Sequence, residues 1–221
     1  MYKVAIFDMD GVIVDTEPLH YKAYHLMFKE VGIEVSPELY ESFTGQSTLN
    51  ICKRIVDHFN LVMMPDQLVR IKRNHFIELF NSDSELSLID GVLERIKDFY
   101  DHRMMLIVAS SASMDNINRI FKRFDLDQYF SYKFSGADIP KSKPHPEIFE
   151  KAAQASGYNK SECFVIEDST NGIKASHAAG IYCFAYKSEH STGQDYSLAN
   201  VVIKSFEEIA FHKLYQFKKA E

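Results

Sequence analysis

The sequence predicts an α/β fold built on a parallel sheet, and three observations lead to this prediction. From residue 90 to the end, short apolar runs alternate with amphipathic segments, a rhythm typical of parallel strands joined by helices. Residues 3–8 are typical of one more buried strand, while residues 17–87 contain no convincing strand. We therefore expect residues 1–16 plus 88–221 to form a Rossmann-like, doubly wound core. Residues 17–87 are expected to form an inserted all-helical domain, which we call the cap.

The expected strands are short and mostly apolar, as strands covered by helices on both faces must be. They lie at residues 3–8, 103–111, 132–135, 162–168, 181–186 and 200–205. Their alternation with helices places them in one sheet, and we expect the first strand to belong to the same sheet.

The expected helices show apolar residues at helical spacing between turn-forming residues. They lie in the cap at residues 17–31, near 37–43, at 47–59 and at 65–81, and in the core after Asp90, at 114–123, 146–156 and 169–180. Asp90 is the expected N-cap of the first core helix. Leu26 falls on the expected apolar face of the first cap helix, and Tyr21, Tyr24 and Phe28 are expected in the cap core.

Composition limits the classes of function. The 221 residues are 46% hydrophobic with a formal net charge of -6, which predicts a packed globular protein and argues against a nucleic-acid partner. The three cysteines lack metal-ligand spacing, so reduced buried thiols are expected and a zinc site is not. No run approaches the ~20 apolar residues of a membrane helix, and no signal peptide is visible. We expect a cytoplasmic protein without a membrane partner, and a monomer as the simplest assembly.

Polar side chains follow four of the expected strands. Ligands of open parallel sheets bind beyond the carboxyl ends of the strands, so these residues are expected at one edge of the sheet. They are Asp8 and Asp10 after the first strand, Ser110 or its neighbour Ser111 after the second, Lys143 in the loop after the third, and Glu167 and Asp168 after the fourth. Four distant segments thereby supply one candidate site.

The charges of this candidate site predict a bound cation. Two carboxylates about 4 Å apart repel by roughly 4 kcal/mol at an effective dielectric of about 20. Lys143 supplies one positive charge, and hard oxygen ligands without a histidine or cysteine cluster suit Mg²⁺. A phosphate group bound to Mg²⁺ would complete the site. Asp8 could then attack phosphorus and form an aspartyl-phosphate, with Asp10 carrying the proton and Ser110 and Lys143 binding phosphate oxygens.

Four motifs, in order along the chain, resemble those of the haloacid dehalogenase superfamily. They are "DMDGVIVDT" at residues 8–16, "LIVASS" at 106–111, "KSKPHPEIF" at 141–149 and "VIEDSTNGIKASHAAG" at 165–180. Each alone is modest evidence, but together they cover both ends of the chain. The helical insertion after the first motif resembles the cap of the beta-phosphoglucomutase and sugar-phosphate phosphatase branch.

The resemblance implies a Mg²⁺-dependent phosphatase that acts on a small phosphorylated metabolite, with a sugar phosphate as the expected class. It implies Asp8 as nucleophile and metal ligand, and Asp10 as the acid–base residue whose backbone carbonyl also binds the metal. The remaining matches are Ser110 and Lys143 as phosphate binders, and Glu167 and Asp168 as the acidic metal site. Whether both of these acids bind the ion directly is left open.

Three cap residues are candidates for assisting the chemistry or setting specificity. The resemblance aligns His20 with a hinge histidine that assists Asp10, and Lys72 with a lysine of the mutase cap. Thr48, in "GQST", stands where the mutase carries an arginine that binds a second phosphate. This departure favours a substrate with one phosphate and water as the final acceptor.

Other functions remain open from the sequence. A phosphomutase is the main alternative, because it forms the same phospho-enzyme but returns the phosphate to a sugar hydroxyl. A dehalogenase needs no metal and would leave Asp10 and Asp168 unexplained. A receiver-type signalling module would need neither the cap nor an acid–base residue two positions after its aspartate. A non-catalytic metabolite binder should have lost a catalytic group, and this chain has lost none.

Overall fold

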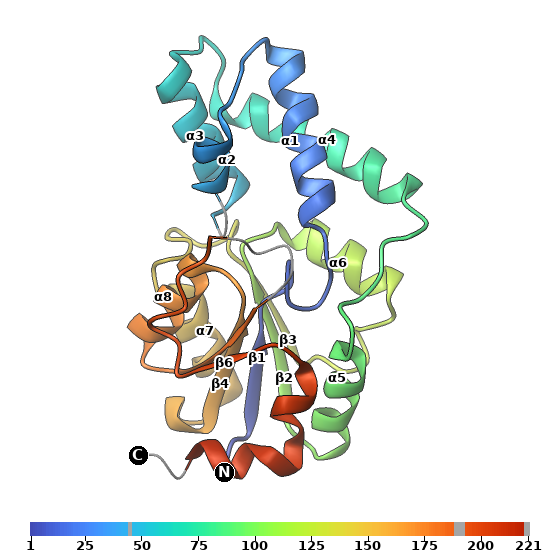
Figure 1. Cartoon of the computed structure of the whole chain (residues 1–221), viewed down its shortest axis with the longest axis vertical. Helices are drawn as coiled ribbons and strands as arrows, with labels where there is room; N and C mark the ends of the chain where they lie inside the picture. Colours follow the sequence, from blue (N-terminus) through green and yellow to red (C-terminus); the bar gives the residue numbers. More distant parts are fainter. Residues whose placement is uncertain (44–45, 188–192, 219–221) are drawn as a thin grey trace.

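The computed structural model describes residues 1–43, 46–187 and 193–218 and shows an elongated molecule of two stacked parts (Figure 1). Gly45 of the "GQST" motif lies outside the described residues. The lower part holds a six-stranded, all-parallel sheet with the strand order β3-β2-β1-β4-β5-β6. The strands are β1 (Val4–Phe7), β2 (Met105–Ser110), β3 (Tyr132–Ser135), β4 (Cys163–Glu167), β5 (Tyr182–Tyr186) and β6 (Val201–Ile203). The predicted α/β class with a doubly wound parallel sheet is confirmed.

Helices cover both faces of this sheet, which explains why its strands are continuous apolar runs. One face packs against α5 (Val92–Asp101), α6 (Met114–Arg123) and the C-terminal 3-10 helices η2 (Phe206–Ile209) and η3 (Phe211–Lys218). The other face packs against α7 (Glu147–Ser156) and α8 (Thr170–Ala179), and a short turn, η1 (Lys160–Glu162), precedes β4. Along β1, Ala5 and Phe7 join the first cluster, while Val4 and Ile6 join the second. The same alternation determines the face of the sheet toward which the side chain of the residue after a strand points.

The segment between β1 and α5 is helical, as predicted. It contains α1 (Glu17–Val31), α2 (Pro37–Glu41), α3 (Thr48–Phe59) and α4 (Pro65–Ser82). These helices enclose a hydrophobic cluster of their own, which includes Met27 of α1, Ile55 of α3 and Leu68 of α4. The exact division between core and cap, after residues 16 and 87, stays a prediction.

Some predicted details are wrong. Tyr21 and Leu26 are 51% and 40% exposed, whereas Tyr24 and Phe28 are buried as expected. The buried face of α1 includes Tyr24 and Phe28 but leaves positions 21 and 26 facing outward. Apolar character alone does not show which side of the helix is covered. Gly91, and not Asp90, is the N-cap residue of α5. The helices η2 and η3 were not predicted.

The carboxyl ends of the strands face the cap, and both termini lie at the opposite end of the molecule (Figure 1). The two connections between cap and core run side by side, because Val14 forms an antiparallel bridge with Leu88. Arg123 of α6 also donates hydrogen bonds to the carbonyl oxygens of Phe80, at 2.8 Å, and Asp83, at 2.5 Å, near the end of α4. The cap is thereby held over the edge where the polar residues were expected.

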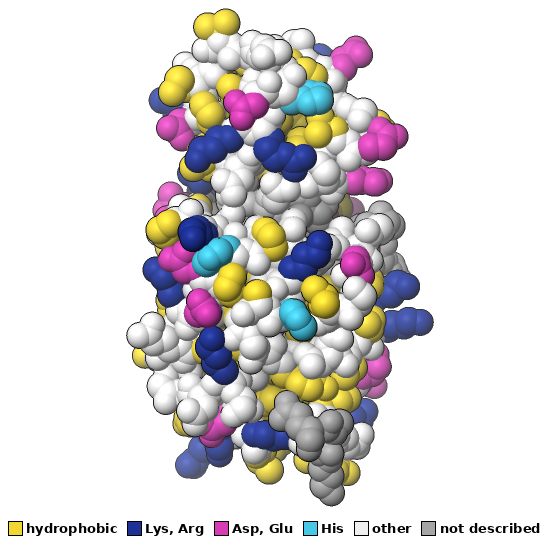
Figure 2. Space-filling model, turned by 90° about the vertical axis from the view of Figure 1, so that its left-hand side faces the viewer, with side chains coloured by type: hydrophobic (Ala, Val, Ile, Leu, Met, Phe, Trp, Pro, Cys, Tyr) yellow, Lys and Arg dark blue, Asp and Glu magenta, His cyan; other side chains and the backbone are white. Residues whose placement is uncertain are grey.

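No helix within the described residues is long and apolar enough to cross a membrane. Figure 2 shows lysine and arginine side chains interspersed with acidic ones over the face that it presents. A broad positive field, as a nucleic-acid backbone would require, is absent from the described residues of that face.

Candidate active site

The register of the sheet brings two carboxylates together. Phe7 of β1 pairs with Ile166 of β4, so Asp8 and Glu167, which follow them, reach the same level and point to the same face. The Asp8 backbone N–H donates to the Ile166 carbonyl at 2.9 Å and extends the ladder by one residue. Asp8 is 7% exposed and Glu167 is fully buried. Strand pairing alone therefore places two acids side by side in the interior.

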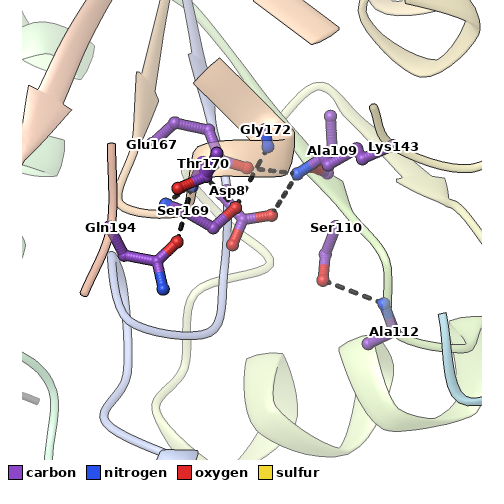
Figure 3. Close-up of polar contacts among 10 residues, drawn as sticks. All are labelled: Asp8, Ala109, Ser110, Ala112, Lys143, Glu167, Ser169, Thr170, Gly172 and Gln194. Atoms are coloured by element: carbon purple, nitrogen blue, oxygen red, sulfur yellow. Dashed lines mark hydrogen bonds and ion pairs between the residues drawn. The ribbon is translucent and has the colours of Figure 1, made fainter. Parts of the chain in front are cut away.

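Lys143 supplies the opposing charge. Its Nζ donates to Asp8 Oδ1 at 2.5 Å, to Glu167 Oε1 at 2.7 Å and to the Ala109 carbonyl at 3.0 Å (Figure 3). Burial lowers the pKa of Lys143, but the two carboxylates outweigh burial and raise it above the ordinary value. The two carboxylates therefore favour the charged ammonium form of the buried Lys143 side chain. Lys141, two residues away, is exposed as expected.

The second oxygen of Glu167 is bound by the start of α8. Glu167 Oε2 accepts from the Ser169 backbone N–H at 2.8 Å and from the Ser169 hydroxyl at 3.0 Å (Figure 3). The Ser169 Oγ in turn accepts from the Gly172 N–H at 3.1 Å as the N-cap of the helix. A Cβ at Gly172 would lie 1.7 Å from Glu167 Oε1, so only glycine fits beside the carboxylate. The role of Ser169 was not predicted. Its position directly after β4, as the N-cap of the next helix, could have indicated a contact with Glu167.

Asp168 completes an acidic cluster. One carboxylate oxygen from each of Asp8, Glu167 and Asp168 lies within 4.8 Å of the others, and all three residues are buried. The loop that carries Asp10 approaches so closely that a Cβ at Gly11, where φ is +79°, would lie 2.2 Å from Asp168 Oδ2. Burial raises the pKa of Asp8 to about 8, with Glu167 and Asp10 adding to the effect and Lys143 opposing it. A divalent cation fits this hard-oxygen donor set, because one lysine does not balance three carboxylates.

Asp10 is held by hydrogen bonds from the hinge and the cap. The Thr16 hydroxyl donates to Asp10 Oδ1, and His20 Nε2 lies 3.4 Å from the same oxygen. Burial raises the pKa of Asp10, but His20 and Thr16 outweigh burial and bring it below the usual value. Asp10 is therefore a carboxylate in this arrangement. The contribution of Thr16 was not predicted, although it belongs to the first motif.

Lys72 fixes the orientation of His20. Its Nζ lies 2.6 Å from His20 Nδ1, and a lysine ammonium can only donate. With Lys72 charged, Nδ1 accepts, and a neutral His20 ring then carries its proton on Nε2, toward Asp10. The His20 ring stacks on Phe76 with centroids 4.5 Å apart. Lys72 is 2% exposed, and burial lowers its pKa to about 8 although Asp10 and Glu17 oppose the shift.

The predicted site residues line one cavity of about 90 Å³. One water molecule needs only ~10–15 Å³, so this cavity has room for more than water alone. Its lining includes every one of them, namely Asp8, Asp10, His20, Thr48, Lys72, Ser110, Lys143, Glu167 and Asp168. Ser110 is 1% exposed, and its Oγ accepts from the Ala112 N–H at 3.1 Å, which leaves its hydroxyl proton for a ligand. Ser111 lines the same cavity, so the choice between the two serines stays a prediction.

The lining also contains a carboxylate that was not predicted. Glu17 begins α1 and faces the cavity near Asp10 and His20, and burial raises its pKa. Its position one turn before His20 was the available signal, but an acidic residue in the first turn of a helix is common without a ligand. The arrangement as a whole offers a buried nucleophile, a second carboxylate for proton transfer and cations for a phosphoryl group.

Comparisons with known proteins agree with this geometry. A model of the haloacid dehalogenase-like hydrolase family matches residues 5–186. The chain is 30% identical over 181 residues to fructose-1-phosphate phosphatase YqaB of Escherichia coli, covering 81% of this chain and 94% of the relative. It is 28% identical over 186 residues to 6-phosphogluconate phosphatase of the same species, covering 83% and 82% of the two chains. Beta-phosphoglucomutase from Clostridium difficile shares the fold with a TM-score of 0.86 at 24% identity, covering 99% and 98%.

Proposed function

The chain belongs to the haloacid dehalogenase-like hydrolase family, and on this premise we propose that it hydrolyses a small sugar phosphate through an aspartyl-phosphate on Asp8, with Mg²⁺ as cofactor. The relatives named as phosphatases make a phosphatase the class of enzyme. One observation carries the proposal. The buried Asp8 carboxylate is held by Lys143 in the same cavity as Asp10, which has its own hydrogen bonds to Thr16 and His20.

Direct metal ligation is assigned to Asp8 and Asp168, together with the Asp10 backbone carbonyl. Glu167 already uses one oxygen for Lys143 and the other for Ser169, so we assign it the role of positioning Lys143. When bound, Mg²⁺ supplies the positive charge that the three acids lack and offsets the charge of the phosphoryl group.

In the first step, the Asp8 carboxylate attacks phosphorus while the bond to the leaving oxygen breaks. Lys143 holds one oxygen of Asp8 in place, so little reorganisation is needed at the moment of attack. The Ser110 hydroxyl and the Lys143 ammonium group bind phosphoryl oxygens. Asp10 donates the proton that the leaving oxygen requires, and the approach of an anionic substrate raises the pKa of Asp10 toward that task.

In the second step, Asp10 acts as the base. It takes a proton from a water molecule, which attacks the phosphorus of the aspartyl-phosphate and releases inorganic phosphate with Asp8 restored. The hydrogen bonds from Thr16 and His20 stabilise the Asp10 carboxylate in this role. Because His20 and Lys72 belong to the cap, this base is complete only with the cap over the core.

The test is phosphate release from a panel of sugar phosphates, nucleotides and pyrophosphate, with and without Mg²⁺. Asp8→Asn is expected to abolish turnover while its circular dichroism spectrum and unfolding midpoint stay near those of the wild type. Asp101→Asn, a change at an exposed acid of α5, serves as the matched control and should keep full activity. Wild-type rates in the Asp8→Asn variant would exclude the mechanism.

A phosphomutase would give a different result in the same assay. Isomerisation of beta-glucose 1-phosphate, primed by the bisphosphate and without net phosphate release, would identify it. Thr48 disfavours this outcome, because an uncharged residue lines the cavity where an arginine would bind a second phosphate.

A further inference from the structure

The connection between β5 and β6 contacts the start of α8, beside the acidic cluster. Gln194 Oε1 accepts a hydrogen bond from the Thr170 backbone N–H at 2.7 Å (Figure 3). In return, Thr170 Oγ1 accepts from the Asp195 backbone N–H at 2.8 Å. Two hydrogen bonds, each between one side chain and one backbone group, therefore join the same two segments. The mechanism described above uses neither Gln194 nor Thr170.

The turn that these hydrogen bonds hold carries an assigned metal ligand. Asp168 lies two residues before Thr170, and Ser169, between them, is the N-cap of α8 and binds Glu167. Thr170 is the first residue of the helix, where a backbone N–H has no partner within the helix itself. Gln194 is the partner here, 24 residues further along the chain. A displacement of this turn would move Asp168 and disturb the contact of Ser169 with Glu167 at the same time.

The position of Asp168 leaves little room for such a displacement. The residue is 4% exposed, and a Cβ at Gly11 would lie 2.2 Å from its Oδ2. One of its oxygens also lies within 4.8 Å of the oxygens of Asp8 and Glu167 that could share an ion with it. Mg²⁺ demands nearly ideal octahedral geometry, with oxygen ligands at about 2.0–2.1 Å. A small shift of the Asp168 backbone would therefore weaken the binding of Mg²⁺.

The β5–β6 connection is itself anchored, so it can serve as a fixed support for α8. Tyr196 packs against a small buried cluster that consists of Ile173, Cys183 and Ala185. This cluster joins α8 to β5, and the connection covers it. Nearer to β6, Asn200 Oδ1 accepts from the Cys183 backbone N–H at 2.8 Å. The hydrogen bonds to Thr170 therefore tie the first turn of α8 to a segment that is held by the sheet.

We propose that Gln194 and Thr170 are positioning residues of the metal site, and we call their two hydrogen bonds the Gln194–Thr170 clamp. The clamp fixes the first turn of α8, and through it the Asp168 carboxylate, in the geometry that binds Mg²⁺ tightly. The inference rests on the metal assignment of the proposed function. It goes beyond that function because it makes the affinity for Mg²⁺ depend on two residues that are not assigned as ligands.

Calorimetric titration of the metal-free protein with Mg²⁺ tests the proposal without any substrate. Gln194→Ala and Thr170→Val each remove one hydrogen bond of the clamp. Each is expected to raise the Kd for Mg²⁺ about tenfold, since loss of a group that orients a metal ligand typically costs about 10- to 100-fold in affinity. Gln194→Glu and Thr170→Ser keep the accepting oxygen and should bind Mg²⁺ at least nearly as tightly as the wild type. Ser197→Ala is the matched control, because Ser197 is an exposed residue of the same connection outside the clamp, and it should leave the Kd unchanged.

A clamp that only stabilises the fold would give a different result. Urea unfolding in a chelator would then show a lower free energy of unfolding for Gln194→Ala and Thr170→Val, while the Kd of the folded proteins for Mg²⁺ stayed that of the wild type. This result would overturn the proposal and leave the proposed function standing. In the phosphatase assay, the two variants should need about tenfold more Mg²⁺ for half of the maximal rate and still approach the wild-type kcat at saturating Mg²⁺.

The two proposals can fail separately. Binding of Mg²⁺ that depends on the clamp, without hydrolysis of any phosphorylated compound, would count against the phosphatase but support the clamp. A wild type that does not bind Mg²⁺ would overturn both the metal assignment and the clamp.

Discussion

Replacing Lys143 with methionine keeps the length of the side chain but removes the ammonium group that binds two buried carboxylates. The Nζ lies 2.5 Å from Asp8 Oδ1 and 2.7 Å from Glu167 Oε1, and Lys143 is 2% exposed. Removing one partner of a buried ion pair costs about 3–5 kcal/mol, because the remaining charge stays desolvated without compensation. We expect the free energy of unfolding of the metal-free protein to fall by that amount at pH near 8 and the catalytic activity to be lost.

The loss should depend on pH in a defined direction. The pKa of Asp8 is raised to about 8 in the folded protein, from an ordinary value of 3.8. Between these values the folded state binds more protons than the unfolded state, so the stability from this group is present at low pH and is lost as pH rises toward 8. Without Lys143 this pKa rises further. The deficit of the variant is therefore expected to change little between pH 5 and pH 7 and to grow from pH 7 to pH 9, where Asp8 ionises beside Lys143 in the wild type but stays protonated in the variant.

Urea unfolding in the presence of a chelator, followed by circular dichroism at pH 7, 8 and 9, measures the effect. Lys141→Met is the matched control, since Lys141 is an exposed lysine of the same loop, and it should change stability by less than about 0.5 kcal/mol. If Lys143→Met and Lys141→Met unfold at the same urea concentration at pH near 8, Lys143 does not balance the buried acids.

Mg²⁺ at about 100 times its dissociation constant is expected to add about 2.7 kcal/mol to the free energy of unfolding. At a fixed Mg²⁺ concentration this stabilisation should be larger near pH 8 than near pH 5, because protons compete with the ion for the same carboxylates. An undiminished shift in Asp168→Asn would contradict the assigned ligands. Gly172→Ala should destabilise the protein by about 2–4 kcal/mol in thermal or urea unfolding, because the contact with Glu167 outweighs the ~1 kcal/mol gain in helix propensity; a stabilised variant would refute the close approach. Lys72→Met should lower kcat by about 10- to 100-fold. A His20→Gln variant should lose as much and the double variant little more, whereas additive losses would show that the two side chains act separately.

The fold was predictable because its strands are buried on both faces. β1 and β4 have every residue buried, so they form continuous apolar runs that differ clearly from the amphipathic helices around them. The pairing order β3-β2-β1-β4-β5-β6 was not predicted, because it depends on contacts between strands far apart in the chain. The buried stripe of α1 was misplaced at Tyr21 and Leu26 for a similar reason, since the direction from which the cap core covers the helix is a tertiary property.

The candidate site divides in the same way. Asp8 and Glu167 were predictable because they follow or end a strand, where parallel strands present their ligands, and Lys143 because it lies in the loop after β3 within one of the recognised motifs. Their pairing through one ammonium group required the register of β1 and β4.

The two carboxylates proposed to be catalytic depend on different parts of the molecule. Asp8 receives its hydrogen bond from Lys143, a core residue, and keeps this partner wherever the cap lies. Asp10 faces His20 and Lys72, which both belong to the cap. A movement of the cap away from the sheet would therefore leave Asp8, the proposed nucleophile, with its partner but separate Asp10, the proposed acid–base residue, from His20 and Lys72. The same movement would admit water, so hydrolysis is most effective when proton transfer and restricted water access are established together by one closure.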